Sequence, residues 1–193
     1  MNKQDVIDFF DHCAPHWDAD MIRSDSIIDT IMDAAGIRES IDVLDVACGT
    51  GVLFPDYCKR NVGSLTGIDI SPKMVEKAKA NFPDAIVLCA DIEEADFAKC
   101  FDAIMIYNAF PHFPDPERLI HCLAGKLNRG GTLTVAHGMS RQALHRHHSG
   151  AASKVSIDLL HEDELADIFT RCGLTVTAKI SDAEKYIVSG TLR

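Results

Sequence analysis

The sequence has no long hydrophobic run: nowhere in its 193 residues do about 18 apolar residues follow one another, the length that a membrane-spanning helix needs. Its N-terminus, MNKQDVIDFF, carries acidic residues where a secretory signal needs a basic region followed by an apolar one. We therefore expect a cytoplasmic protein with no membrane partner.

Paired cysteines are also lacking, because none of the seven cysteines forms a CxxC pair. No HExxH motif occurs either, so the usual spacings of zinc sites are absent. Some cysteines lie inside apolar runs, such as LDVAC at 44–48 and IVLCA at 86–90. This pattern favours buried, reduced thiols over a disulfide framework.

Positive charge is scarce as well. Lys and Arg number 19 against 29 Asp and Glu, a net charge of −10. Such a chain repels phosphate backbones, so we expect no nucleic-acid partner. Hydrophobic residues make up 47% of the chain, enough to build a core, and the length suits one domain.

Short apolar runs alternate with helical patterns along the chain. The runs that we interpret as parallel strands are 41–47, 64–70, 85–90, 101–107 and 132–137. Helices are predicted at 72–82 and 115–127, the second ending in a glycine turn at 128–131. Two last runs, 174–180 and 184–192, are too close for a parallel crossover and predict an antiparallel hairpin. The pattern predicts a doubly wound, Rossmann-like α/β fold with a seven-stranded, mostly parallel sheet.

The segment VLDVACGTGVL at 43–53 predicts a strand that ends at Asp45 and enters a turn of small residues. Gly49 and Gly51 would let the backbone approach a ligand closely. A dinucleotide fingerprint needs a third glycine, but that position holds Phe54. A carboxylate at Asp45 would repel a pyrophosphate and suit an ammonium group.

Two more acids end the next predicted strands. Asp69, 24 positions after Asp45, can accept hydrogen bonds from both ribose hydroxyls. Asp91 can accept the amino group of adenine, while the N–H of Ile92 bonds a ring nitrogen. Three acids at consecutive strand ends indicate a nucleoside that carries an amine and no phosphate, so S-adenosylmethionine fits better than NAD.

At this point the sequence resembles class I S-adenosylmethionine-dependent methyltransferases, in particular the small-molecule group similar to the ubiquinone and menaquinone C-methyltransferases. The resemblance follows an ordered series of segments: HWDAD at 16–20, VLDVACGTG at 43–51, GIDISPKMVEKA at 67–78, ADIEEADF at 90–97, FDAIMIYNAFPHFPD at 101–115 and LIHCLAGKLNRGGTLTV at 119–135. It implies S-adenosylmethionine as cofactor and S-adenosylhomocysteine as product.

By position, the resemblance assigns the cofactor contacts to thirteen residues. Those of the methionine part and the glycine turn are Asp45, Ala47 (glycine in many members), Cys48, Gly49, Thr50, Gly51 and Asn108. Those of the ribose and adenine are Asp69, Ile70, Met74, Asp91 and Ile92, with Trp17 closing over the cofactor. Met74 is equally interpretable as a core residue, and Trp17 as a plug that packs the first helix onto the sheet.

The pattern of elements, together with the resemblance, divides the single domain, 1–193, into four parts. These are an N-terminal helical cap (1–40, with helices at 3–12 and 24–36), the cofactor-binding core (41–137), a substrate lid (138–160), and the last helix with the hairpin (161–193).

Two histidines, His112 and His137, are predicted near the acceptor as catalytic bases. His137 ends the fifth strand. For His112, the alternative interpretation is a structural role. Methyl transfer needs a base only when the acceptor must lose a proton, so the accepting atom (O, N, C or S) stays open.

The segment HGMSRQALHRHHSG at 137–150 has three interpretations. Arg141, His145 and His148 could bind an anionic acceptor, or His137, His145 and His148 could bind a divalent metal, or the segment is an exposed polar helix. We expect methyl transfer to a small-molecule acceptor. The alternatives are a metal-assisted, metalloid-directed or thiol-directed methyltransferase, and a non-catalytic S-adenosylmethionine-binding regulatory module. No feature of the sequence indicates an oligomeric state.

Overall fold

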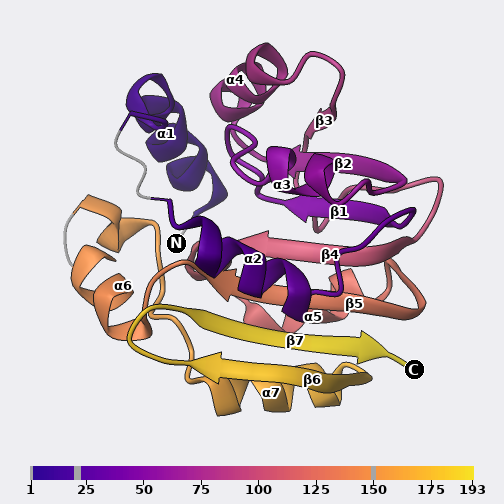
Figure 1. Cartoon of the computed structure of the whole chain (residues 1–193). Coiled ribbons are helices and arrows are strands. Elements are labelled where there is room, and N and C mark those ends of the chain that lie inside the picture. Colours follow the sequence, from indigo (N-terminus) through magenta and orange to yellow (C-terminus); the bar gives the residue numbers. More distant parts are fainter. Residues whose placement is uncertain (1, 20–22, 149–150) are drawn as a thin grey trace.

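A computed structural model describes residues 2–19, 23–148 and 151–193, without the side chains of residues 147, 148, 151 and 152. Seven strands form one sheet in the order β3-β2-β1-β4-β5-β7-β6 (Figure 1). They are β1 (Asp42–Val46), β2 (Ser64–Asp69), β3 (Ile86–Cys89), β4 (Phe101–Tyr107), β5 (Leu127–His137), β6 (Leu174–Ser181) and β7 (Tyr186–Leu192).

The first five strands are parallel, and β7 is antiparallel to both β5 and β6. The predicted α/β fold with a C-terminal antiparallel hairpin is therefore confirmed. Because the carboxyl ends of the parallel strands share one edge of the sheet, the residues that follow β1, β2, β3 and β4 come together there.

Helices cover both faces of the sheet. In Figure 1, α2 crosses in front of the strands, while α5 and α7 lie behind them. The helices are α1 (Lys3–Cys13), α2 (Asp25–Ala34), α3 (Phe54–Lys59), α4 (Pro72–Asn81), α5 (Pro116–Ala124), α6 (Arg141–His148) and α7 (Glu162–Arg171), with 3-10 turns η1 (Ala14–His16), η2 (Phe110–His112) and η3 (Ala151–Lys154). Both predicted N-terminal helices are thus present.

Two hydrophobic clusters separate along these faces. One joins the sheet to α2 and α3 through residues such as Ile31 and Tyr57. The other joins it to α5, α6 and α7 through residues such as Leu123, Leu144 and Leu165. Among the described residues, no helix has both the length and the apolar character required to cross a bilayer.

Local sequence signals set where the helices begin. The Ser71 hydroxyl accepts the Met74 N–H at 3.1 Å, and Pro72 follows at the first helical position of α4. His161 caps α7 in the same way and forms a capping box with Glu164, so it precedes the helix rather than opening it as predicted.

The glycine turn predicted at 128–131 does not end the helix, because α5 ends at Ala124. Residues 128–131 belong to β5, and the register of the β4–β5 pairing shifts between Phe101 and Ala103. Gly130 has a φ of +79°, and Gly131 lies where a Cβ would be 2.9 Å from the Asn128 carbonyl oxygen. The glycines therefore lie in an irregular part of β5, where the strand advances five residues while β4 advances two.

The strand β3 is more open than a strand covered on both faces. Ile86 and Leu88 are 57% and 37% exposed, and only Val87 of its four residues is buried. β3 forms one edge of the sheet, and α4 packs against it.

Candidate active site

Asp45 and Asp69 lie at the carboxyl ends of neighbouring strands β1 and β2, and both are buried, with 2% and 8% exposure. One oxygen of Asp69 accepts the Gly49 N–H at 2.9 Å, and the other accepts the Ser71 N–H at 2.9 Å. Asp69 therefore joins the glycine turn after β1 to the start of α4.

The two acidic side chains lie close together in a buried, poorly solvated part of the site. Burial raises the pKa of Asp45 well above its usual value, and the neighbouring Asp69 raises it further. Burial also raises the pKa of Asp69, although its hydrogen bonds from Ser71 and Gly49 oppose the rise. A ligand cation at this place would relieve the repulsion and favour the ionised form of Asp45.

The turn after β1 depends on left-handed backbone. Gly49 and Gly51 have φ values of +55° and +88°, and a Cβ on Gly51 would lie 2.9 Å from the Phe82 ring. Ala47 also adopts a left-handed φ of +54°, which is unfavourable for alanine and explains why glycine suits this position. Cys48 is buried, and burial raises the pKa of its thiol, which disfavours the reactive thiolate.

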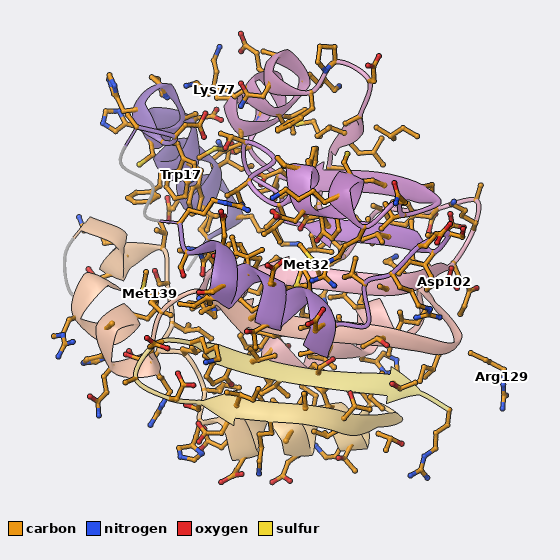
Figure 2. The ribbon with its side chains drawn as sticks, viewed as in Figure 1. Trp17, Met32, Lys77, Asp102, Arg129 and Met139 are labelled. Carbon is orange, nitrogen blue, oxygen red and sulfur yellow. The ribbon has the colours of Figure 1, made fainter. Side chains whose placement is uncertain are left out.

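The segment after η1 lies over this turn. The Thr50 hydroxyl donates to Asp18 at 2.5 Å, and the indole nitrogen of Trp17 is 4.0 Å from the position of a Cβ on Gly49. Trp17 also packs edge-on against Phe10 of α1, with ring centroids 5.6 Å apart. Figure 2 shows Trp17 below α1, at the same end of the sheet as Met139, which precedes α6.

Helix α1 crosses the carboxyl ends of β2 and β3. Asp11 accepts the Ser71 hydroxyl at 2.6 Å and the Lys73 N–H at 3.0 Å. At the other end of the helix, Lys3 pairs with Asp91 and, at 3.1 Å, with Glu93. Sequence reasoning missed Lys3 and Asp11, because no local pattern indicates a contact between residues 88 or 60 positions apart.

The predicted adenine contacts follow β2 and β3. One oxygen of Asp91 accepts the Glu93 N–H at 2.9 Å, which fixes the loop after β3. Ile92 and Met74 are buried at 4% and 1% exposure, while Ile70 is half-buried. These residues stand around the end of β2 and β3, at the edge where a nucleoside would lie.

Asn108, which follows β4, has a φ of +54°, a conformation that asparagine tolerates better than most residues. Its side-chain oxygen accepts the Gly138 N–H at 2.9 Å. The carboxyl ends of β4 and β5 are held together by this bond.

The two histidines predicted near the acceptor have different surroundings. Nδ1 of His112 is 2.8 Å from the Val155 carbonyl oxygen, and its ring packs edge-on against Phe10 at 4.8 Å. His137 is fully buried, beside Tyr186 with ring centroids 6.2 Å apart. The sequence had suggested that His137 opens into a cleft, and instead the protein encloses its ring.

The 138–160 segment, interpreted as a substrate lid, contains α6. Arg141 and His145 are exposed, and His145 Nδ1 lies 2.9 Å from an Asp158 oxygen. The side chain of His148 lies outside the described residues. Within the described part of the chain, no three His, Cys, Asp or Glu side chains are grouped so as to hold a metal ion.

Comparison with known proteins decides what this arrangement is. Residues 44–135 match the family described as a methyltransferase domain. The chain contains a class I S-adenosylmethionine-dependent methyltransferase domain.

The methyltransferase domain has relatives among curated proteins and solved structures. A malonyl-[acyl-carrier protein] O-methyltransferase of Anoxybacillus flavithermus is 35% identical over 126 residues, 62% of this chain and 47% of the relative. The protein of that name from Acetivibrio thermocellus is 31% identical over 157 residues, 77% and 55% of the two chains. The chain thus spans about half the length of these relatives.

Magnesium protoporphyrin IX methyltransferase of Synechocystis PCC 6803 has the same fold, with a TM-score of 0.75 over 99% of both chains at 15% identity. The family and fold predicted from the sequence are confirmed, and S-adenosylmethionine is the cofactor of the domain. The residues fit S-adenosylmethionine. The buried Asp45 carboxylate is stabilised in its ionised form by a nearby cation, and the methionine part of the cofactor carries an ammonium group.

Proposed function

We propose that this methyltransferase transfers a methyl group from S-adenosylmethionine to a carboxylate oxygen of a small acceptor. The observation that carries the methyl-transfer part is the pair of buried acids, Asp45 and Asp69, at the glycine turn. This pair favours a cationic nucleoside over a phosphorylated one.

When bound, S-adenosylmethionine supplies a methyl group on a sulfonium, which an acceptor takes by in-line displacement. Asp45 would hold the ammonium group, Asp69 the ribose hydroxyls and Asp91 the adenine amine. Trp17 and α1 would shield the cofactor from water, since they lie over the glycine turn and across the ends of β2 and β3. These residues would thereby hold the cofactor at the carboxyl ends of the strands and supply its methyl group to an acceptor there.

The oxygen acceptor is supported by two observations. First, α6 brings Arg141, His145 and Arg146 to the acceptor side of a chain whose net charge is −10. Such a local basic group favours an anionic ligand such as a carboxylate. Second, the two relatives described above are named O-methyltransferases of a malonyl compound.

A carboxylate at neutral pH is already deprotonated, so a protein base is not needed for its methylation. His112 would then support the site by joining η2 to Val155, and His137 by its place at the end of β5. Their direct contact with the acceptor stays a prediction, as do the cytoplasmic location and the absence of nucleic-acid and membrane partners.

The test is a methyl-transfer screen that measures S-adenosylhomocysteine release. The acceptors are malonyl thioesters, simple dicarboxylates, quinols, amines and thiols, each with and without a chelator. We expect carboxylates to be methylated equally well with the chelator present. Turnover confined to quinols, amines or thiols would contradict the proposed acceptor, and a rate restored only by metal would support the metal-assisted alternative, which no observation on the described residues favours.

A further inference from the structure

Helix α1 docks onto the cofactor side of the molecule with few buried side chains of its own. Of its 11 residues only Val6 is fully buried, whereas the shorter α2 buries Ile28, Ile31 and Met32. A helix with so little buried apolar surface opens at a low cost in free energy unless polar contacts hold it. The polar contacts of α1 therefore contribute much of what keeps it docked.

One of these contacts lies at the start of α1. Lys3 pairs with Asp91 and, at 3.1 Å, with Glu93, and these two acidic side chains are only 15% and 10% exposed. Glu93 also pairs with Arg118 of α5 at 3.1 Å, so Lys3 belongs to a network of charges. A network of this kind stabilises more than an isolated surface pair, which contributes little.

The other contact lies at the end of α1, which packs beside α4 (Figure 1). One oxygen of Asp11 accepts the hydroxyl of the fully buried Ser71 at 2.6 Å and the Lys73 N–H at 3.0 Å. The carboxylate also suits the positive end of the α4 dipole. Charge-assisted hydrogen bonds such as these are roughly twice as strong as neutral ones.

Both contacts end on residues that belong to the cofactor site. Lys3 donates to one oxygen of Asp91, the proposed acceptor of the adenine amine. Asp11 holds the Ser71 hydroxyl, and the Ser71 N–H donates to Asp69, the proposed ribose ligand. A carboxylate oxygen can accept more than one hydrogen bond, so Asp91 can pair with Lys3 and still accept from adenine. The docking of α1 and the binding of the cofactor therefore order the same side chains.

We propose that Lys3 and Asp11 are positioning residues that couple the docking of α1 to cofactor binding. The docked helix holds the adenine and ribose ligands in place and slows cofactor release, and the bound cofactor in turn keeps α1 docked, because coupling between two sites is reciprocal. This coupling rests on the proposed cofactor contacts of Asp69 and Asp91. It makes the exchange of S-adenosylhomocysteine for S-adenosylmethionine depend on the opening of α1.

The dissociation rate of S-adenosylhomocysteine tests the coupling and needs no acceptor. Surface plasmon resonance on the immobilised protein measures this rate. Lys3→Met should release S-adenosylhomocysteine about 5- to 10-fold faster than the wild type, since lost contacts act mainly on dissociation. Asp11→Ala should have the same effect, and Lys3→Arg, which keeps the charge, should restore slow release.

The matched control is Lys179→Met. Lys179 also forms an ion pair between two elements, with Asp163 of α7, but it lies in β6, at the opposite edge of the sheet from β3. This variant should dissociate like the wild type. Raising NaCl from about 50 to about 500 mM should accelerate release from the wild type and Lys179→Met more than from Lys3→Met, because salt screens the Lys3 pairs.

Hydrogen exchange gives the reciprocal measurement. Saturation with S-adenosylhomocysteine should slow amide exchange in α1 of the wild type by about 10-fold, and by less in Lys3→Met. A lysine that only stabilised the fold would change Tm and leave both the dissociation rate and this protection unchanged.

The coupling is wrong if Lys3→Met or Asp11→Ala releases S-adenosylhomocysteine at the wild-type rate, or if α1 exchanges equally with and without it. Slower release from Lys3→Met would also overturn the coupling, because Lys3 would then compete with the adenine for Asp91. A failure of the proposed function looks different, since the wild type would not bind S-adenosylhomocysteine or would methylate only non-carboxylate acceptors.

Discussion

Asp69 accepts the backbone N–H of Gly49 at 2.9 Å, which ties the end of β2 to the glycine turn that follows β1. The same carboxylate accepts the Ser71 N–H through its other oxygen. Because a carboxylate oxygen can accept more than one hydrogen bond, Asp69 can keep both contacts and still bind ribose hydroxyls. The residue is thus positioned by the fold before the cofactor binds.

Replacing Asp69 by alanine should weaken S-adenosylmethionine binding by about 10- to 100-fold, since hydrogen bonds to a charged acceptor each contribute roughly 1.5–3 kcal/mol. Isothermal titration calorimetry measures the change. Asp84→Ala, an exposed acid between α4 and β3, is the control and should bind like the wild type. Equal affinities for the two variants would remove Asp69 from the site.

Ala47→Gly should increase the free energy of unfolding by about 1 kcal/mol, because the left-handed φ of +54° is unfavourable for alanine and not for glycine. Chemical denaturation measures the difference. Ala80→Gly, at an exposed position in α4, should instead lower stability by about 0.5–1 kcal/mol. If both changes destabilise the protein equally, the backbone at Ala47 is not strained.

The raised pKa of Asp45 predicts two opposite dependences on pH. In the cofactor-free protein the folded state holds the Asp45 proton more tightly than the unfolded state, so protonation of Asp45 stabilises the fold. This contribution to stability is fully present below the unfolded pKa of about 3.9 and is lost as pH rises through the folded pKa. The ammonium group of S-adenosylmethionine favours ionised Asp45, so its affinity should rise over the same range.

Calorimetry in buffers of different ionisation enthalpy should show that cofactor binding releases protons at the acid end of this range. Asp45→Asn should remove the release, weaken binding and stabilise the cofactor-free protein at neutral pH. Proton release that persists in Asp45→Asn would assign it to another group.

Trp17 is the only tryptophan of the chain, and its indole nitrogen faces Gly49. S-adenosylhomocysteine binding should therefore change the intrinsic tryptophan fluorescence. Trp17→Phe should reduce affinity by about 3- to 10-fold through lost apolar contact. An emission spectrum that does not change on saturation would mean that Trp17 only packs α1 onto the sheet.

The rate of carboxylate methylation should be constant between about pH 6 and 8, because the acceptor needs no base in this range. A rate that falls below about pH 6.5, the ordinary range of histidine titration, would indicate a general base. In that case His112→Gln, compared with the exposed His121→Gln on α5, would show whether His112 is that base.

Much of the fold could be predicted because periodicity and short connections are local properties of the sequence. The hairpin of β6 and β7 followed from its short connection, and the acids at the strand ends followed from the parallel order. The inclusion of Gly130 and Gly131 in β5 could not be predicted, because a strand irregularity and a turn use the same residue types.

The placement of the candidate site residues could be predicted only where they follow a strand. The position of Asp45, Asp69 and Asp91 at strand ends could be predicted because each belongs to or follows an apolar run, whereas the contacts of Lys3 and Asp11 depend on how α1 lies across the sheet. The enclosure of His137 was missed for a similar reason, since Tyr186 at the start of β7, distant in the sequence, packs against its buried ring.

The most direct measurement of the central claim is a calorimetric titration of the wild-type protein with S-adenosylmethionine, S-adenosylhomocysteine and NAD. The account predicts one site that binds both adenosyl compounds and does not bind NAD, with both interactions weakened in Asp69→Ala. Binding of NAD, or no binding of either adenosyl compound by the folded protein, would contradict it.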